Sequence, residues 1–172
     1  MNVFFHIAAV VAIASTIMAI SGRNAIHSLL YLILSLLAIS VIFYLLDAPF
    51  IAALEVIIYA GAIVVLFIFV IMMLNIGLEK RMEKRWLRPR MWIFPLILSA
   101  ILLLDFILAL NRMGLVPSSQ QAVLPKEVGI SLFSTYLLAS EIAGMLLLIG
   151  VIGAYHLGSQ KKKVVHRFLE KK

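Results

Sequence analysis

The chain has 172 residues, of which 64% are hydrophobic, and its mean hydropathy is +1.12. Soluble domains are only about half apolar, so these values predict an integral membrane protein without a large soluble domain. The absence of Cys excludes disulfides, thiolate metal sites, Fe–S clusters and Cys nucleophiles on this chain. The formal net charge of +7 does not indicate nucleic-acid binding, because the charges gather at the edges of apolar runs, where they set membrane orientation.

Five apolar runs predict an all-α integral membrane protein with five transmembrane helices. The runs are residues 3–20, 25–46, 50–74, 92–110 and 132–157. The predicted organisation is a single transmembrane domain over residues 1–160, followed by a basic cytoplasmic tail over residues 161–172. The polar stretch 111–129 is expected to be a loop, with a short helix as the alternative.

The distribution of cations predicts the orientation of the chain. Apart from Arg112 and Lys126, all of the 15 Lys and Arg residues lie in the turn after the first run, in the segment 79–90, or in the tail. With five spans these three segments face the same side of the membrane. The positive-inside rule therefore predicts the N-terminus outside, in the periplasm, and the C-terminus in the cytoplasm. The same clusters are expected to contact lipid headgroups.

The third run, residues 50–74, contains Glu55 as its only charged residue. As a helix it is about 37 Å long, which exceeds the ~30 Å core of a bilayer. Gly61 lies next to its midpoint and is followed by β-branched residues, which weakens an α-helix there. These residues predict a hinge beside a proton-bearing side chain. The alternative is that the small residues around Gly61 only allow a neighbouring helix to approach closely.

Three acidic residues lie within the predicted spans, whereas Lys and Arg are absent from them: Glu55, Asp105 and Glu141. Each acid is therefore protonated, hydrogen-bonded, hydrated or paired with another subunit. Glu55 and Tyr59 are four residues apart and share a helix face, which favours a proton path there. Glu141 is a weaker candidate of the same kind. Asp105 lies near the outer end of its run and is expected to snorkel or to cap the helix.

The chain shows no pattern typical of a catalytic, metal or nucleotide site. The four His residues are not spaced as ligand pairs, and a Gly-rich phosphate loop or Ser/His/Asp constellation is absent. We therefore expect no catalytic residue, cofactor or metal on this chain.

Several segments resemble subunit J of bacterial proton-translocating NADH-quinone oxidoreductase, respiratory complex I, a family related to mitochondrial NADH dehydrogenase subunit 6. The segments are residues 24–32, 53–67, 70–75 and 128–148. The resemblance implies a five-helix subunit of the bacterial inner (plasma) membrane that carries no electrons itself. It also implies subunits A, H and K and the antiporter-like subunits as partners, with FMN, Fe–S clusters and quinone bound elsewhere in the complex.

The resemblance further implies a π-bulge in the third helix that switches between π and α forms and gates a hydrated proton path. The hinge residues implied in this way are Tyr59, Ala60, Gly61, Ala62, Val64 and Val65, with Glu55 and Tyr59 bordering the path. The chain would then couple quinone reduction to proton translocation. Two alternatives remain: a related small subunit of a membrane-bound hydrogenase or multisubunit cation/proton antiporter, and a purely structural helix scaffold.

Overall fold

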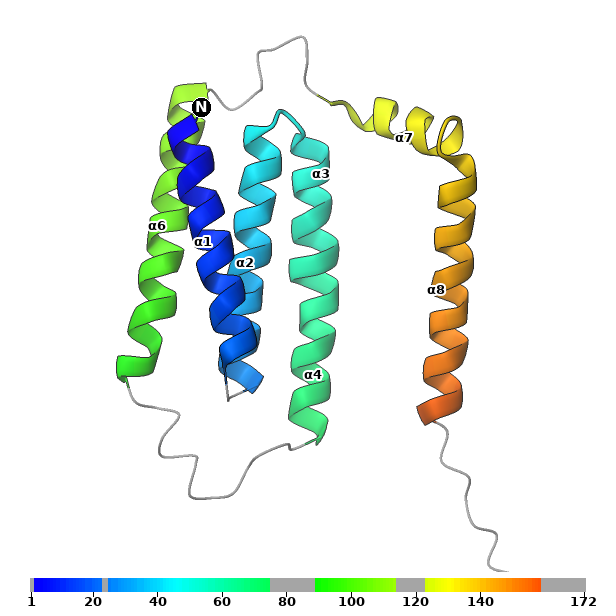
Figure 1. Ribbon diagram of the computed structural model, residues 1–172, viewed down its shortest axis with the longest axis horizontal. Coiled ribbons are helices and arrows are strands. Elements are labelled where there is room, and N and C mark those ends of the chain that lie inside the picture. The colour runs from blue at the N-terminus through cyan, green and yellow to red at the C-terminus, as the bar shows by residue number, and fades with distance from the viewer. Residues whose placement is uncertain (1, 23–24, 75–88, 114–122, 159–172) are drawn as a thin grey trace, which may run out of the picture. The chain divides into compact units, whose positions relative to one another are not determined.

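The structure is a computed structural model that describes residues 2–22, 25–74, 89–113 and 123–158 (Figure 1). All elements in the described part of the chain are helical. They are α1 (Asn2–Ser21), α2 (Ala25–Leu45), α3 (Pro49–Leu54), η1 (Glu55–Ile63), α4 (Val64–Leu74), α6 (Pro89–Met113), α7 (Pro125–Phe133) and α8 (Leu137–Gly158). Within these residues, five helices are long and apolar enough to cross a membrane, which confirms the predicted number of spans. The third span comprises α3, η1 and α4 in one continuous rod.

The chain divides into two compact units, Met1–Pro125 and Lys126–Lys172. The first contains the helices from α1 to α6, and the second contains α7 and α8. The single domain predicted over residues 1–160 remains a prediction. The predicted tail and most of the basic segment 79–90 lie outside the described residues.

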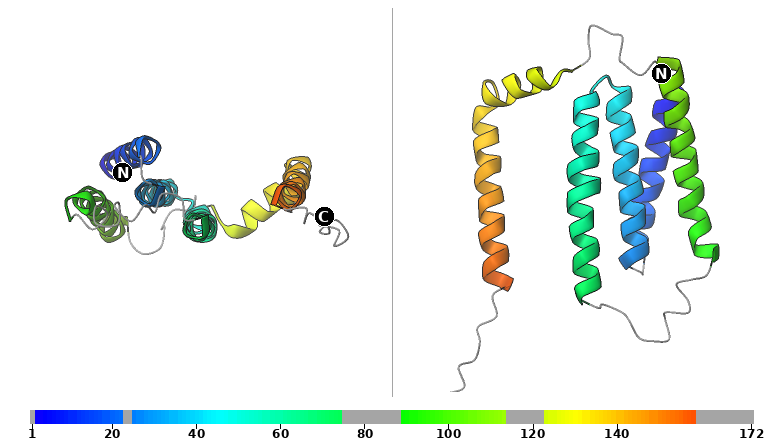
Figure 2. Two further views of the ribbon diagram at one scale, coloured as in Figure 1. Left: turned by 90° about the horizontal axis from the view of Figure 1, so that it is seen from below. Right: turned by 180° about the vertical axis from the view of Figure 1, so that it is seen from behind.

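Helix α2 is the central element of the first unit. It contacts α1, α6 and all three parts of the third span (Figure 2). The core between α1, α2 and α6 consists mainly of aliphatic and small residues, namely Ala8, Val11, Ala12, Leu34, Ala38, Val41, Leu45, Leu98, Leu102 and Ala109. Small residues let transmembrane helices approach closely, and dispersion contacts then hold them together.

Hydroxyl groups add specific contacts between α1 and α2. The Thr16 and Ser35 hydroxyl oxygens lie 2.7 Å apart, and both hydroxyls reach the Ala12 carbonyl, Thr16 at 2.8 Å and Ser35 at 3.2 Å. Such bonds across helices fix the register of a pair that has little hydrophobic drive to associate inside lipid.

The turn between α2 and α3 is closed by a Schellman motif. The Ala48 N–H donates to the Phe43 carbonyl, and the Asp47 N–H donates to the Tyr44 carbonyl. Asp47 adopts φ 60°, a left-handed conformation that Asp tolerates better than most residues. Pro49 then occupies the first turn of α3, where its missing N–H costs no hydrogen bond. This short connection places the third span directly beside α2.

Aromatic contacts align α2 with α6. His27 packs edge-on against Trp92, and farther along the same pair of helices Tyr44 packs against Phe106 with ring centroids 5.6 Å apart. Edge-to-face geometry is the preferred arrangement of such rings. These contacts hold α6 against α2.

The second unit corrects the predicted start of the fifth span. The run 132–157 was expected to be one helix, but α7 continues to Phe133 and α8 begins only at Leu137. The turn between them is stabilised by the Ser140 hydroxyl, which donates to the Leu132 carbonyl at 3.1 Å. Part of the predicted loop 111–129 is therefore helical from Pro125, which suits a first helical turn.

Candidate functional site

The middle of the third span is wound as a π-helix. Its nine residues, Glu55–Ile63, lie between two α-helical segments of the same rod. At its end, the Val64 N–H donates to the Tyr59 carbonyl, five residues back, and also to the Gly61 carbonyl. π-Helical segments are rare and are frequently found at functional sites. This geometry makes η1 the candidate site of the chain.

Gly61 lies at a close approach of the backbone within η1. A Cβ atom at position 61 would stand 3.1 Å from the Val56 carbonyl oxygen, which is tighter than most Cβ contacts. That oxygen belongs to the residue five positions back, which is the acceptor position of π winding. Glycine therefore keeps this close approach free of a Cβ atom.

The change of register leaves a surplus backbone acceptor. The Val64 N–H donates to the carbonyl five residues back, whereas an N–H in an α-helix donates to the carbonyl four residues back. Where the rod returns to α winding, one backbone carbonyl is therefore skipped and has no N–H donor from its own helix. Inside a bilayer an unsatisfied carbonyl costs several kcal/mol. We therefore expect this carbonyl, at the end of η1, to accept a hydrogen bond from a water molecule or from a polar side chain of a neighbouring subunit.

Glu55 and Tyr59, the two residues predicted to border a proton path, both lie in η1. Glu55 is the first π-helical residue and is half-buried, and the Tyr59 side chain is 50% exposed. Among the described residues no hydrogen bond joins the Glu55 carboxylate to the Tyr59 phenol.

One side of η1 is anchored and the rest is open. Just before η1, the buried Ser40 hydroxyl donates to the Ala52 carbonyl at 2.8 Å, and just after it Val64 is only 1% exposed. Between these two points Ile57 is 65% exposed. Outside its own span η1 contacts mainly α2, and Figure 2 shows the third span at the edge of the helices of the first unit.

A cavity adjoins the start of η1. Its volume is about 420 Å³, and it lies between α2, the first half of the third span and α6. The lining includes Ser40 and Tyr44 from α2, Val56 from η1 and Phe106 from α6. Side chains at the start of η1 therefore border open space on the inner side of the first unit as well as on its outer edge.

The hinge residues implied by the resemblance fall partly outside the π segment. Tyr59, Ala60, Gly61 and Ala62 lie within η1, whereas Val64 and Val65 belong to α4. The π-helix begins four residues earlier than that implied segment, at Glu55. The acidic side chain is therefore part of the rewound segment itself and does not merely neighbour it.

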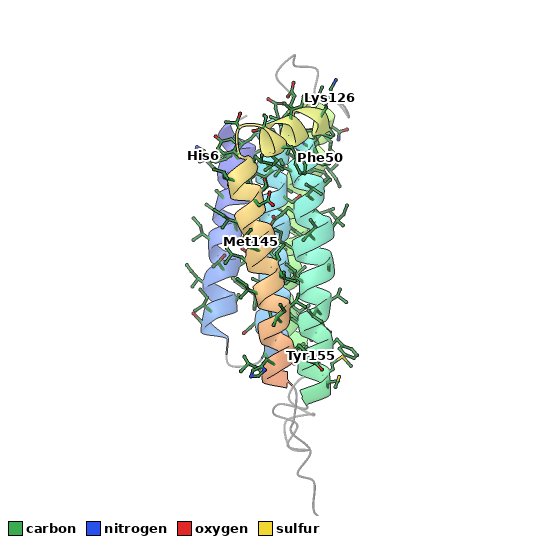
Figure 3. The ribbon with its side chains drawn as sticks, turned by 90° about the vertical axis from the view of Figure 1, so that its right-hand side faces the viewer. His6, Phe50, Lys126, Met145 and Tyr155 are labelled. Carbon is green, nitrogen blue, oxygen red and sulfur yellow. The ribbon has the colours of Figure 1, made fainter. Side chains whose placement is uncertain are left out.

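Glu141 belongs to α8 in the second unit, and its side chain is exposed. Within the second unit the side chains of α8 are largely exposed, those of Met145 and Tyr155 among them (Figure 3). The neighbouring Ser140 hydroxyl is engaged by the Leu132 carbonyl. Nothing in the described part of the second unit pairs with the Glu141 carboxylate, so it keeps the status of a weaker candidate.

The expectation for Asp105 is wrong. Asp105 neither snorkels nor caps α6: it is 3% exposed, and neither of its carboxyl oxygens has a hydrogen-bond partner. The sequence showed its position along α6 but not which face of α6 packs against α1 and α2. The burial of Asp105 is therefore a feature that only the helix packing reveals.

Among the described residues, no group of three or more His, Asp or Glu side chains could hold a metal ion. The side chains of the site are a carboxylate, a phenol and aliphatic groups, together with a backbone acceptor. Such a set can bind and pass protons or hold water, but it lacks a nucleophile activated by a base.

Comparison with known proteins identifies the family. The family NADH-ubiquinone/plastoquinone oxidoreductase chain 6 matches residues 15–157. NADH-quinone oxidoreductase subunit J of Pseudomonas aeruginosa is 48% identical over 168 residues, covering 95% of this chain and 99% of the relative. The subunit J of Escherichia coli K12 is 49% identical over 166 residues, covering 94% of this chain and 89% of the relative.

The chain belongs to this family. Subunit J of Buchnera aphidicola subsp. Schizaphis graminum, 46% identical over 166 residues, covers 94% of this chain and is itself covered completely. As a bacterial family member with five candidate spans, the chain is a multi-pass membrane protein. These relatives are subunits of NADH-quinone oxidoreductases, so the family comparison does not favour the hydrogenase or antiporter alternative.

Proposed function

We propose that this chain couples quinone reduction to proton translocation through η1, within the NADH-quinone oxidoreductase of which this family member is a subunit. The observation that carries the proposal is a π-helix in mid-span that begins at the only charged residue of that span. Electron transfer takes place on other subunits, so the role of this chain is to change conformation and to control a path for protons.

The physical basis is a change of winding. Converting η1 to an α-helix shifts the register by one residue, which rotates the Glu55 end of the span by about 100° relative to α4. A rotation of this size carries Glu55 and Tyr59 to another face of the rod. The cavity beside Val56 and the open outer side of η1 give the side chains space for this movement.

Only the π form has the surplus carbonyl at the end of η1. In that form the carbonyl, the Tyr59 phenol and the Glu55 carboxyl provide successive polar groups along the span, and water molecules can bridge such groups. The α form satisfies the carbonyl internally and removes one of these groups. Switching the winding therefore opens and closes the proton path.

We place the open side of η1 against other membrane-arm subunits, with subunits A, H and K and the antiporter-like subunits as the neighbours. The exposure of η1 supports this arrangement, because a half-buried acid at a bundle edge needs a polar partner when lipid is the alternative. The proposed orientation has the N-terminus in the periplasm and the C-terminus in the cytoplasm, following the cation distribution.

The experiment that tests this function uses Glu55→Gln and Tyr59→Phe in the assembled complex in sealed membrane vesicles. We expect both variants to lower the number of protons pumped per NADH oxidised, because each removes a group that exchanges protons. NADH oxidation with a water-soluble electron acceptor should stay unchanged, since that reaction bypasses the membrane arm.

Matched controls come from α8, where Tyr155 is exposed. Tyr155→Phe should leave the pumping ratio unchanged, and Glu141→Gln tests the weaker acidic candidate in the same assay. If Glu55→Gln and Tyr59→Phe assemble and pump normally, the site is structural and the helix-scaffold interpretation replaces the coupling function.

A further inference from the structure

Asp105 is an acidic side chain that the proposed coupling function does not use. It lies on the face of α6 that also carries Leu98, Leu102 and Ala109, at helical spacing. That face forms a core with α1 and α2, and only 3% of the Asp105 surface is exposed. Both carboxyl oxygens are buried without a hydrogen-bond partner.

No charged group on the neighbouring helices compensates a carboxylate at this position. The titratable side chains of α1 and α2 are His6, which is exposed beside Phe5, and His27, Tyr31 and Tyr44, which pack edge-on against aromatic rings of α6. None of them bonds to Asp105, and the sequences of α1 and α2 contain no Lys or Arg, while α6 itself carries Arg90 and Arg112 near its two ends.

An ionised carboxylate in such surroundings is far less stable than the neutral acid. An isolated charge in an apolar medium loses most of its solvation free energy, so a buried group of this kind takes up a proton instead. Burying the neutral acid without a hydrogen bond is far less costly, and helix packing can offset that cost.

We propose that the Asp105 carboxyl is a second proton-binding site of this chain, enclosed by α1, α2 and α6 and separate from the η1 site. The separation follows from the packing, because α6 contacts chiefly α1 and α2, while η1 contacts chiefly α2 outside its own span. The proton at Asp105 exchanges with solvent only when α6 parts from its neighbours. Asp105 is therefore a slowly exchanging site, whereas Glu55 lies at an open surface.

Infrared spectroscopy of the assembled complex tests this directly, because a protonated carboxyl has a C=O stretch that an ionised carboxylate lacks. Subtracting the spectrum of Asp105→Asn from that of the wild type should leave one band of a neutral carboxyl group. After transfer to D2O this band should shift, as its proton is replaced by deuterium, more slowly than the corresponding band from wild type minus Glu55→Gln. A carboxylate band in the Asp105→Asn difference spectrum, or a neutral band that exchanges at once, would overturn the proposal.

A second variant covers the case in which the amide disturbs assembly. Asp105→Leu replaces an unpaired polar group by an apolar one of similar size, and such replacements are often neutral or stabilising. We expect the Leu variant to assemble and to melt at the same temperature as the wild type or above it. A lower melting temperature, or failure to assemble, would show that Asp105 has a polar partner and would contradict a neutral, unpaired acid.

Discussion

The Val56 carbonyl oxygen lies 3.1 Å from the position that a Cβ atom at Gly61 would take. This pair links the sequence to the winding of η1. In the π form a Cβ atom at position 61 would be in tight contact with this oxygen, whereas α winding puts the Val56 carbonyl one residue out of register with position 61.

Gly61→Ala is expected to shift the third span towards α winding. The added methyl crowds the Val56 carbonyl in the π form, and overpacking of this kind costs about 1 kcal/mol or more, roughly a fivefold change in the ratio of the two forms. The proton-to-NADH ratio in sealed vesicles should fall while electron input is unchanged. Gly150→Ala on α8 is the matched control, because a Cβ there meets nothing within 4 Å in this chain. Equal behaviour of the two variants would remove the link between Gly61 and winding.

Ser40→Ala is expected to loosen the start of the rewound segment. The Ser40 hydroxyl holds the Ala52 carbonyl at 2.8 Å, and its loss weakens the α2–α3 contact by about 1 kcal/mol. The Ala52 carbonyl still accepts the Glu55 N–H, so no orphaned group results. The coupling ratio should fall modestly in this variant. Ser35→Ala, which breaks a hydroxyl contact between α1 and α2 instead, should leave coupling unchanged; a loss of coupling in both would point to general destabilisation.

Substitutions at Asp47 should separate backbone strain from side-chain chemistry. The backbone of Asp47 has φ 60°. Asp47→Val places a β-branched residue in this left-handed region, at a cost of about 1–2 kcal/mol, whereas Asp47→Gly relieves the strain. The melting temperature of the purified complex should fall for Val and stay level or rise for Gly. A loss of stability with Gly would show that the Asp47 carboxylate, rather than its backbone, is what the turn requires.

The sequence specified the spans well because a bilayer imposes a simple rule on length and polarity. The runs 25–46 and 50–74 differ from α2 and the third span by a single residue at one end. The fifth span was misplaced at its start because the break before Leu137 depends on hydroxyl bonds such as that of Ser140, which carry no hydropathy signal.

The candidate site was partly accessible from the residues. From Gly61 and the single acidic residue Glu55, the sequence predicts a weak point in the third helix within the segment that is π-helical in the structure. That the π winding begins at Glu55 could not be predicted, because it depends on the hydrogen-bond register of the backbone. Asp105 was misjudged for a different reason. Its distance from the end of α6 can be read from the sequence, whereas its burial depends on which face of α6 meets α1 and α2.

The most direct test of the coupling proposal is the backbone register of the third span in the assembled complex, determined by cryo-electron microscopy at rest and during NADH-driven turnover. We predict that part of the population in turnover has the Val64 N–H bonded to the Ala60 carbonyl, as in an α-helix, with Glu55 on a different face from that in the π form. If Val64 stays bonded to Tyr59 in every state while the complex pumps protons, η1 is a fixed structural feature and the coupling mechanism is contradicted.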